Sequence, residues 1–402
     1  METLPFEIQY KILSFIDDCT SLYNLLRASP AISRLFDHEG LQLTRTVFSK
    51  ENTCDQIRES IHLIAMLESS SFAYSSLAVL TYGFIHITVK DTLPLRIGET
   101  RPTPLPKDLP DKTPIPTIRR ILSIYAQINH LTIACLEHYL EKFNALQPEN
   151  LVDPEARYYE KSLPWTQRFE SFKVPVHNYG PPLWEEEQRV SRALWRIQLF
   201  YELCTAGQSR LGWPAEDVAR LKSMNESDLY IKWHLCYETK EIQTVIEYIN
   251  WARAADLVIS HDPSSSNSGG YNRGIRRLPF LRHPVEQRWP TPRRPDPEPI
   301  TQTYEIDSGT FGLRQWQILT KINSSPLRTV KFDSYRRLGV ALWCKKRFQA
   351  MGLVPMNREE RHPQVNLSSW QFAWRSILDP CEVREVERRL QKEWEEEREP
   401  KD

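Results

Sequence analysis

Glycine is scarce in this sequence, with 13 residues among 402. Loops that hold phosphate groups, and the first turn of doubly wound nucleotide-binding folds, need glycine at fixed spacings. The chain contains neither the G-x-x-x-x-G-K-[ST] pattern of phosphate-binding loops nor the G-x-S-x-G pattern of many hydrolases. The sequence therefore argues against a nucleotide-binding fold and shows no motif for a catalytic nucleophile.

An excess of either charge is also lacking. Lys and Arg number 52, and Asp and Glu also number 52, so the formal net charge is zero. A strong basic excess would indicate nucleic acid as a partner, and an acidic excess would indicate a solvating tail. We therefore do not expect nucleic acid to be a partner.

The seven cysteines lack the close spacing of metal or redox motifs, because no two form a C-x-x-C pair. Their number is odd and their spacings are wide, which argues against a disulfide framework. A secretory signal is also missing, since Glu7, Lys11 and Asp17 interrupt the early apolar residues. We expect an intracellular protein, in the cytoplasm or the nucleus.

Long uncharged runs are limited to residues 69–89, which read SSSFAYSSLAVLTYGFIHITV. The segment is long enough to span a bilayer, but five Ser, two Thr and His86 lower its hydrophobicity. We expect a buried helix of a soluble core and no membrane partner. The alternatives are a helix followed by a short β-like segment at Ile85–Val89, and a membrane segment.

Metal-binding spacings are not found either. His130, Cys135 and His138 lie within nine residues of one predicted helix. These spacings do not bring the three side chains to one point, as a metal site requires. The chain also has no H-E-x-x-H pattern. We therefore predict no cofactor, no metal site and no enzymatic activity.

Apolar residues at helical spacing are abundant. The chain is 40% apolar and 11% aromatic, which is enough for a substantial core. The pattern predicts helices at residues 117–146, 182–206, 228–259, 332–351 and 381–399, the last one highly charged. Gly207 and Gly352 are the predicted ends of two of them. Strand signals are weak, so we predict a mainly α protein with a large irregular helical domain at residues 46–402.

The 29 prolines are unevenly placed and separate the helical segments. Residues 91–118 hold seven prolines, which predicts an extended Pro-rich connector. Residues 260–303 hold eight prolines and seven arginines, which predicts a mobile Arg/Pro-rich loop. Because the arginines there alternate with aromatic residues, a docking or modification site and a nucleic-acid contact are alternatives to a solvated loop.

The N-terminal segment carries the most regular pattern of the chain. Leu4, Ile8, Ile12 and Phe15 or Ile16 recur at intervals of four, four and three to four, which predicts an amphipathic helix over residues 4–16. A leucine-rich second helix follows, Ser29-Pro30 ends or bends it, and a further turn or two complete the segment. Three such short helices cannot bury all of their apolar surface among themselves. The surplus implies docking on the rest of the chain or on a partner.

This segment resembles an F-box. The matching residues are Leu4-Pro5-x-Glu7-Ile8-x-x-x-Ile12-Leu13-Ser14-Phe15-Ile16, then Ser21-Leu22, Leu25-Leu26 and Ala28-Ser29. Where many F-boxes carry a basic residue and Trp after the second helix, this chain has Pro30-Ala31-Ile32-Ser33-Arg34-Leu35-Phe36. We assign residues 1–45 to an F-box-like motif. The rest is faintly similar to uncharacterised fungal F-box-like proteins, at Trp195-Arg196-x-Gln198, Arg337-Leu338-Gly339, Trp343 and Gly352.

The resemblance implies a three-helix motif that binds a Skp-type adaptor protein and, through it, a cullin. The chain would then recruit a protein substrate of unknown identity to a cullin-type (SCF) ubiquitin ligase. The residues that the resemblance places against the adaptor are Leu4, Pro5, Ile8, Ile12, Leu13, Leu22, Leu25 and Leu26. The alternative is a stand-alone helical scaffold whose N-terminal helices are part of its own core.

Overall fold

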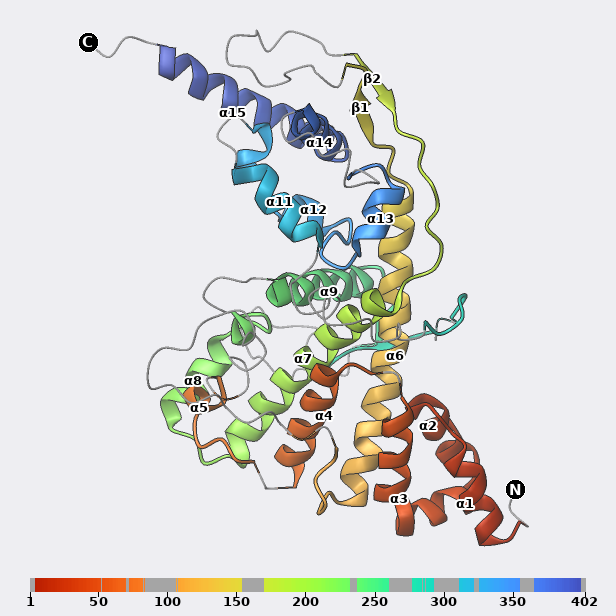
Figure 1. The fold of residues 1–402 in the computed structure, drawn as a ribbon. Coiled ribbons are helices and arrows are strands. Elements are labelled where there is room, and N and C mark those ends of the chain that lie inside the picture. Colours follow the sequence, from red (N-terminus) through yellow and green to blue (C-terminus); the bar gives the residue numbers. More distant parts are fainter. Residues whose placement is uncertain are drawn as a thin grey trace, which may run out of the picture. The chain divides into compact units, whose positions relative to one another are not determined.

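The protein is mainly α, as predicted, in the computed structural model shown in Figure 1. The structure describes residues 4–51, 53–69, 72–81, 83, 106, 108–153, 170–231, 237–259, 277–283, 285, 287–292, 311–321, 325–354 and 365–398. Within these residues, β structure is limited to two short antiparallel strand pairs.

The chain forms two compact units. Unit 1 comprises residues 1–136 and 187–298, and unit 2 comprises residues 137–186 and 299–402. The division falls within two long helices, α6 (Ile115–Asn144) and α7 (Trp184–Ser209), each of which contributes to both units. The two units are described separately below.

Unit 1 begins with three helices: α1 (Phe6–Ser14), α2 (Cys19–Ala28) and α3 (Pro30–Lys50). Asp18 caps α2 by accepting a hydrogen bond from the Ser21 amide, and Ser29 caps α3 with Pro30 at its first position. The prediction of only a turn or two after Ser29 was wrong, because Pro30 starts a helix of 21 residues. This helix continues past residue 45, where we ended the F-box-like motif.

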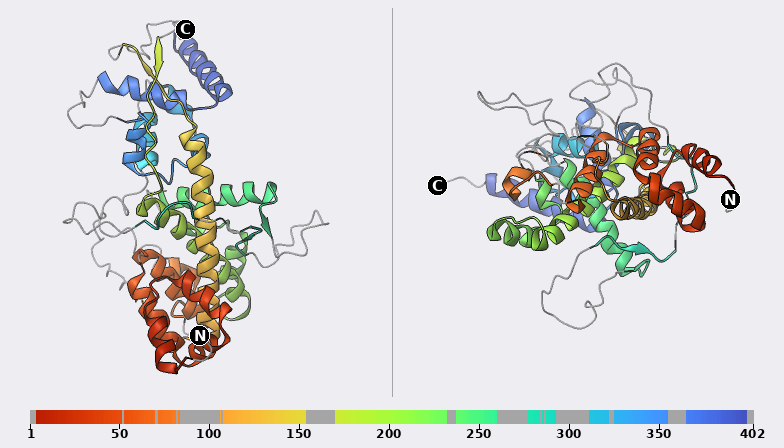
Figure 2. Two further views of the ribbon diagram at one scale, coloured as in Figure 1. Left: turned by 90° about the vertical axis from the view of Figure 1, so that its right-hand side faces the viewer. Right: turned by 90° about the horizontal axis from the view of Figure 1, so that it is seen from below.

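The rest of unit 1 contains α4 (Asp55–Glu68), α5 (Leu77–Leu80), α8 (Ala215–Ser223), the 3-10 turn η3 (Asp228–Tyr230) and α9 (Tyr237–Ala254). Strand β3 (Val258–Ile259) pairs with β4 (Phe280–Leu281). The predicted helix at residues 117–146 is confirmed as α6. Figures 1 and 2 show α2 and α3 beside the N-terminal part of α6, whose Ile118, Ile121 and Leu122 are fully buried.

Within the described residues, the long uncharged segment contains only part of the buried helix that we expected. Helix α4 ends at Glu68, and the four-residue α5 follows, with Leu77 and Leu80 buried. The serines that dilute this run favour turns and caps, and Ser76 indeed caps α5. Residues 84–90 lie outside the described part of the chain. None of the described helices is both long and apolar enough to cross a membrane.

The described residues of unit 2 contain the paired strands β1 (Glu149–Leu151) and β2 (Ser171–Lys173) and six short or medium helical elements. These are α11 (Phe311–Lys321), η4 (Pro326–Thr329), α12 (Asp333–Arg336), α13 (Lys345–Ala350), α14 (Val365–Ser376) and α15 (Pro380–Arg398). Aromatic rings form its core: Phe348 stacks on Trp374 at 5.7 Å and meets Phe143 edge-on at 5.6 Å. The predicted C-terminal charged helix is confirmed as α15.

Three helix predictions in the second half were only partly correct. The predicted helix at residues 228–259 is α9, preceded by the 3-10 turn η3 and followed by strand β3. Residues 332–351 form the short helices α12 and α13 instead of one helix. Between them Gly339 takes φ +71°, and a Cβ at this position would lie 2.8 Å from Cβ of Tyr139. The chain thus turns at Gly339 against α6, which a continuous helix could not do. The predicted stop at Gly207 lies inside α7, which ends at Ser209.

Two predicted loops fall largely outside the described residues. Of the Pro-rich connector 91–118, the structure describes residues 106 and 108–118, where α6 begins at Ile115. Of the Arg/Pro-rich loop 260–303, it describes residues 277–283, 285 and 287–292, which include β4.

Candidate protein-docking surface

Helix α1 packs on the protein through one narrow face. Leu13 is completely buried and Gln9 nearly so, four residues apart on the side that meets α3. The Gln9 side chain also donates a hydrogen bond to the Leu4 carbonyl at 2.9 Å, which closes the first turn. At the other end of α1, Nζ of Lys50 donates to the Ser14 carbonyl and joins the end of α3 to α1.

Large apolar side chains are exposed on α1 and at the residues that flank its two ends. Leu4 is 37% exposed, Phe6 50%, Ile8 45% and Phe15 73%. We call these four residues the α1 apolar surface. Contiguous apolar side chains on the surface of a folded protein mark sites of interaction more often than isolated ones do.

The structure separates the eight residues predicted to contact an adaptor into three groups. Leu4, Pro5 and Ile8 are exposed. Ile12 and Leu25 are half-buried. The buried group is Leu13, Leu22 and Leu26. In this conformation the buried group packs the three helices together, while the exposed group is available to a partner.

Phe6 and Phe15 belong to the exposed surface although neither was among the predicted site residues. Phe15 follows Ile12 at three residues and therefore continues the stripe of Leu4 and Ile8, a signal already present in the spacing. Phe6 lies between stripe positions, so no periodic signal identifies it. Its exposure follows from its place at the first turn of α1, ahead of Gln9.

Helix α3 is fixed to α6 by a forked arginine. The Arg119 guanidinium donates to Oδ1 of Asp37 at 2.7 Å and to the Ser33 carbonyl at 2.7 Å. It also lies over the Phe36 ring, 5.2 Å from its centroid. In the same way Asn129 of α6 donates to the Thr20 hydroxyl of α2 at 3.3 Å. The three N-terminal helices are therefore held in place by unit 1 while the α1 apolar surface stays uncovered by the described residues.

A carboxyl group with a shifted pKa lies where α2 begins and α3 ends. The Cys19 amide donates to Oε1 of Glu51 at 3.5 Å. Burial raises the pKa of Glu51 to about 7, against the lowering effect of hydrogen bonds from Cys19 and Tyr125. Burial and the charge of Glu51 raise the pKa of Glu187 to about 7 as well. Protonation of Glu51 and Glu187 should therefore change the stability of the region where α2 begins and α3 ends.

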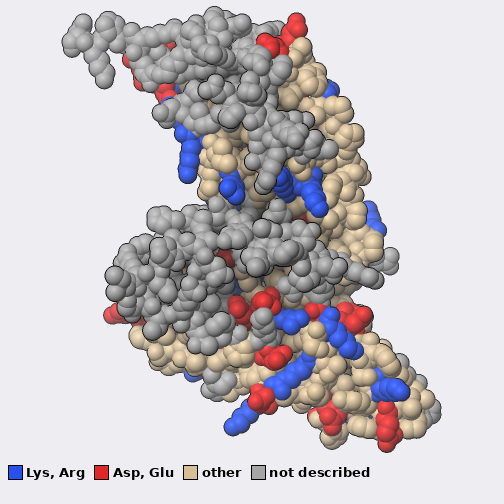
Figure 3. All heavy atoms as spheres, in the orientation of Figure 1, with Lys and Arg blue, Asp and Glu red and all other residues tan. Residues whose placement is uncertain are grey.

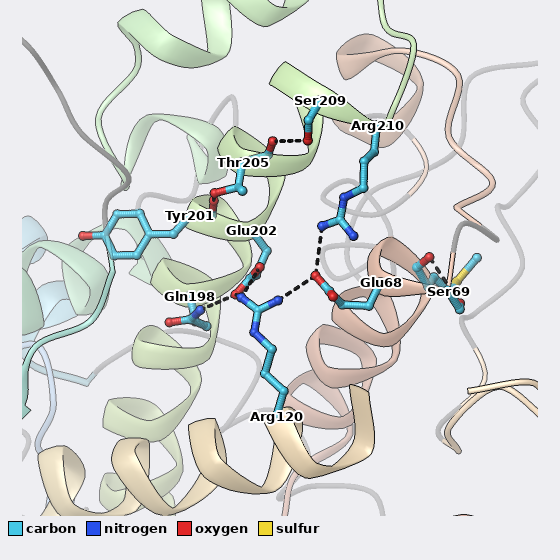
Figure 4. Close-up of polar contacts among 10 residues, drawn as sticks. Glu68, Ser69, Arg120, Gln198, Tyr201, Glu202, Thr205, Ser209 and Arg210 are labelled. Carbon is cyan, nitrogen blue, oxygen red and sulfur yellow. Dashed lines mark hydrogen bonds and ion pairs between the residues drawn. The ribbon is translucent and has the colours of Figure 1, made fainter. Parts of the chain in front are cut away.

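A second polar cluster, shown in Figure 4, joins α4, α6 and α7 within unit 1. The Arg120 guanidinium lies between two carboxylates, 2.6 Å from Oε1 of Glu68 and 2.6 Å from Oε1 of Glu202. Arg210 also contacts Glu68 at 2.9 Å. Burial would raise the pKa of Glu68, but Arg210 and Arg120 hold it below its ordinary value. Each charge here has an opposite charge beside it, which is typical of ion pairs that stabilise the packing of helices.

The described residues contain no group of three or more His, Cys, Asp or Glu side chains that could hold a metal ion. His130, Cys135 and His138 do not converge in the structure. Burial lowers the pKa of His130, and burial with the charge of Lys142 lowers the pKa of His138 to about 4. Both imidazoles are therefore neutral at pH 7.

Comparison with known proteins gives no match of any kind. No family model matches the chain, no curated protein resembles it, and no solved structure matches its fold.

Proposed function

We propose that the α1 apolar surface binds a Skp-type adaptor and that the chain thereby recruits a protein target to a cullin-type ubiquitin ligase. The proposal rests on two observations together: the F-box-like residue pattern of the N-terminal segment, and the exposure of Leu4, Pro5 and Ile8 among the residues that carry it. The observation with most weight is that Leu4, Ile8 and Phe15 lie on the outer side of α1.

The direction in which the apolar stripe of the N-terminal segment faces supports the proposal. An amphipathic helix at the end of a chain ordinarily turns its apolar stripe toward the core. Here the buried positions are Gln9 and Leu13, and the stripe that starts at Leu4 and Ile8 faces outward. Burying apolar surface against a partner gains about 25 cal/mol per Å². A partner with an apolar groove would therefore gain from covering this helix.

In this proposal the chain tethers and performs no bond chemistry. α1–α3 hold the adaptor, and the remaining helices present the target to the ligase. The ubiquitin transfer is carried out by other subunits.

A pull-down of the full chain with a purified Skp-type adaptor tests the proposal. Leu4→Glu/Ile8→Glu places two charges on the docking surface and should abolish binding. Because both side chains are exposed, the fold should be retained, which circular dichroism would verify. A matched control is Ile231→Glu/Trp251→Glu, which alters two exposed apolar residues elsewhere in unit 1 and should bind normally. Absence of binding by the folded wild-type chain would overturn the proposal.

The competing function is a stand-alone helical scaffold. The burial of Leu13, Leu22 and Leu26 favours it, since these residues act as core of the protein itself. A scaffold would bind no adaptor, and Leu4→Glu/Ile8→Glu would then change neither its partners nor its stability.

A further inference from the structure

Basic residues are concentrated in one part of unit 2. The described residues 311–321 and 325–354 contain nine Lys or Arg and a single acidic residue, Asp333. The nine are Arg314, Lys321, Arg328, Lys331, Arg336, Arg337, Lys345, Lys346 and Arg347. In a chain with no net charge, this is a strong local excess.

Four of the nine are neutralised by ion pairs. Arg347 is buried and contacts Glu186 at 2.8 Å. The others pair as Arg328 with Glu393, Arg336 with Asp333, and Arg337 with Glu382. For the remaining five, no ion pair exists among the described residues. We call these five the basic surface: Arg314, Lys321, Lys331, Lys345 and Lys346.

Helix α11 displays part of this surface as a regular stripe. Arg314, Ile318 and Lys321 follow one another at four and three residues, so they share one side of the helix. All three are exposed, with Ile318 at 42%, whereas Leu313 and Leu319 on the other side are buried. The stripe is therefore an apolar residue flanked by two cations.

Packing brings the other cations to the same region of unit 2. The Trp316 indole donates to the Val330 carbonyl at 3.0 Å, so the chain at Lys331 lies beside α11. Phe311 contacts Phe348 of α13 at 5.5 Å, one turn from Lys345. Figure 3 shows Lys and Arg side chains gathered over the elements that Figure 1 labels α11, α12 and α13.

Acidic residues on α15, in the same unit, are already engaged. On α15, Glu385 contacts Arg388 at 2.8 Å and Arg389 at 2.7 Å. Glu387 pairs with Arg375. Like charges gathered without compensation repel one another and attract a partner of opposite charge. The basic surface thus lacks an internal partner among the residues that the structure describes.

We propose that the basic surface binds an acidic segment of another protein, with an apolar side chain of that segment covering Ile318. Charge complementarity determines the class of partner, and the exposed isoleucine between two cations adds the apolar contact. Nucleic acid fits less well. Four of the five cations are Lys, and the described residues 311–354 expose no large aromatic side chain on which a base could stack. The inference does not depend on adaptor binding by α1.

Fluorescence anisotropy with a labelled peptide of Glu-Glu-Leu repeats tests the proposal on the full chain. We expect binding that weakens as salt is raised, because the contacts are between exposed charges. Arg314→Glu/Lys321→Glu should weaken it by about tenfold or more, since two attractions become repulsions. Ile318→Ser should also weaken binding but leave its salt dependence unchanged.

A matched control separates the surface from net charge. Lys112→Glu/Lys173→Glu makes the same change in net charge at exposed residues outside the basic surface and should bind the peptide as the wild type does. Equal loss in both double variants, or no binding by the wild type, would overturn the proposal. Tighter binding of a single-stranded DNA oligonucleotide than of the peptide would replace it with a nucleic-acid site.

The two proposed surfaces can fail independently. Leu4→Glu/Ile8→Glu should still bind the acidic peptide, and Arg314→Glu/Lys321→Glu should still bind the adaptor. If Leu4→Glu/Ile8→Glu loses peptide binding as well, the assignment of the peptide to the basic surface is wrong.

Discussion

At the scale of single residues, the buried ion pair of Glu186 and Arg347 is a contact of unit 2 whose loss should destabilise the fold strongly. Both side chains are essentially inaccessible to water. Oε1 of Glu186 accepts from Nε of Arg347 at 3.0 Å and from the Cys344 amide at 3.0 Å. Removing one partner leaves the other charge buried without compensation.

We therefore expect Arg347→Met to lower the free energy of unfolding by about 3–5 kcal/mol. Urea denaturation followed by circular dichroism measures the change. The control is Lys346→Met at the exposed neighbouring position, which should change stability by less than about 0.5 kcal/mol. Equal effects of the two variants would show that the Glu186 pair does not hold α13 in place.

The second residue-scale prediction concerns Glu51 and pH. Its pKa rises from an ordinary 4.5 when unfolded to about 7 when folded. The folded state therefore binds more protons between these values, so stability falls as pH rises from about 4.5 to about 7. Arg58 donates to the backbone carbonyl of Glu51 at 2.9 Å, and the charge of Asp18 also raises the pKa of the Glu51 carboxyl. Above pH 7 the penalty of the buried charge is complete.

We expect Glu51→Gln to raise the free energy of unfolding at pH 8 by roughly 1–3 kcal/mol and to flatten its dependence on pH below 7. Glu7→Gln, at an exposed position of α1, serves as the control and should follow the wild-type profile. Denaturation midpoints measured at several pH values test this. A wild-type stability that rises between pH 5 and pH 7, and a Glu51→Gln profile parallel to it, would refute the account.

At the scale of elements, α1 combines a buried residue, Leu13, with an exposed one, Ile8. Leu13→Ala removes a fully buried side chain and should weaken the attachment of α1 by about 2–4 kcal/mol. Ile8→Ala removes an exposed one and should cost less than about 0.5 kcal/mol. Hydrogen exchange of the α1 amides distinguishes them: faster exchange only in Leu13→Ala is expected. Faster exchange in Ile8→Ala would place Ile8 in the core.

The long helices were predictable from sequence because their apolar faces repeat over many turns. The predicted helix 117–146 matches α6, and the predicted helix 182–206 matches α7 apart from its end. The prediction failed at residues 332–351, where we expected one helix to continue past Gly339. There the local spacing favours a helix, but the chain turns so closely against Tyr139 that no Cβ fits. Tertiary contact overrode the local pattern.

The candidate site was partly predictable for the same reason. Spacing identified the stripe of Leu4, Ile8 and Ile12, but spacing alone does not say which side of a helix meets the core. The burial of Gln9 beside Leu13 decided that question. The spacing of apolar residues does not predict that a polar residue, Gln9, lies on the inner face of α1.

At the scale of the whole molecule, overall neutrality concealed local charge. Equal totals of 52 acidic and 52 basic residues argued against an electrostatic partner. Yet the described residues of 311–354 are strongly basic, whereas many of the acidic residues of unit 2 lie on α15. From the sequence we identified a basic segment at residues 260–303 and did not predict the stripe of α11. The net charge of a chain does not describe the local charge of the single surface that a partner contacts.

Hydrogen exchange of the full chain with and without a purified Skp-type adaptor tests whether an adaptor covers α1. We expect slower exchange over residues 4–16 when the adaptor is added, with α15 unchanged. Exchange over residues 4–16 that stays the same at saturating adaptor would contradict the proposal.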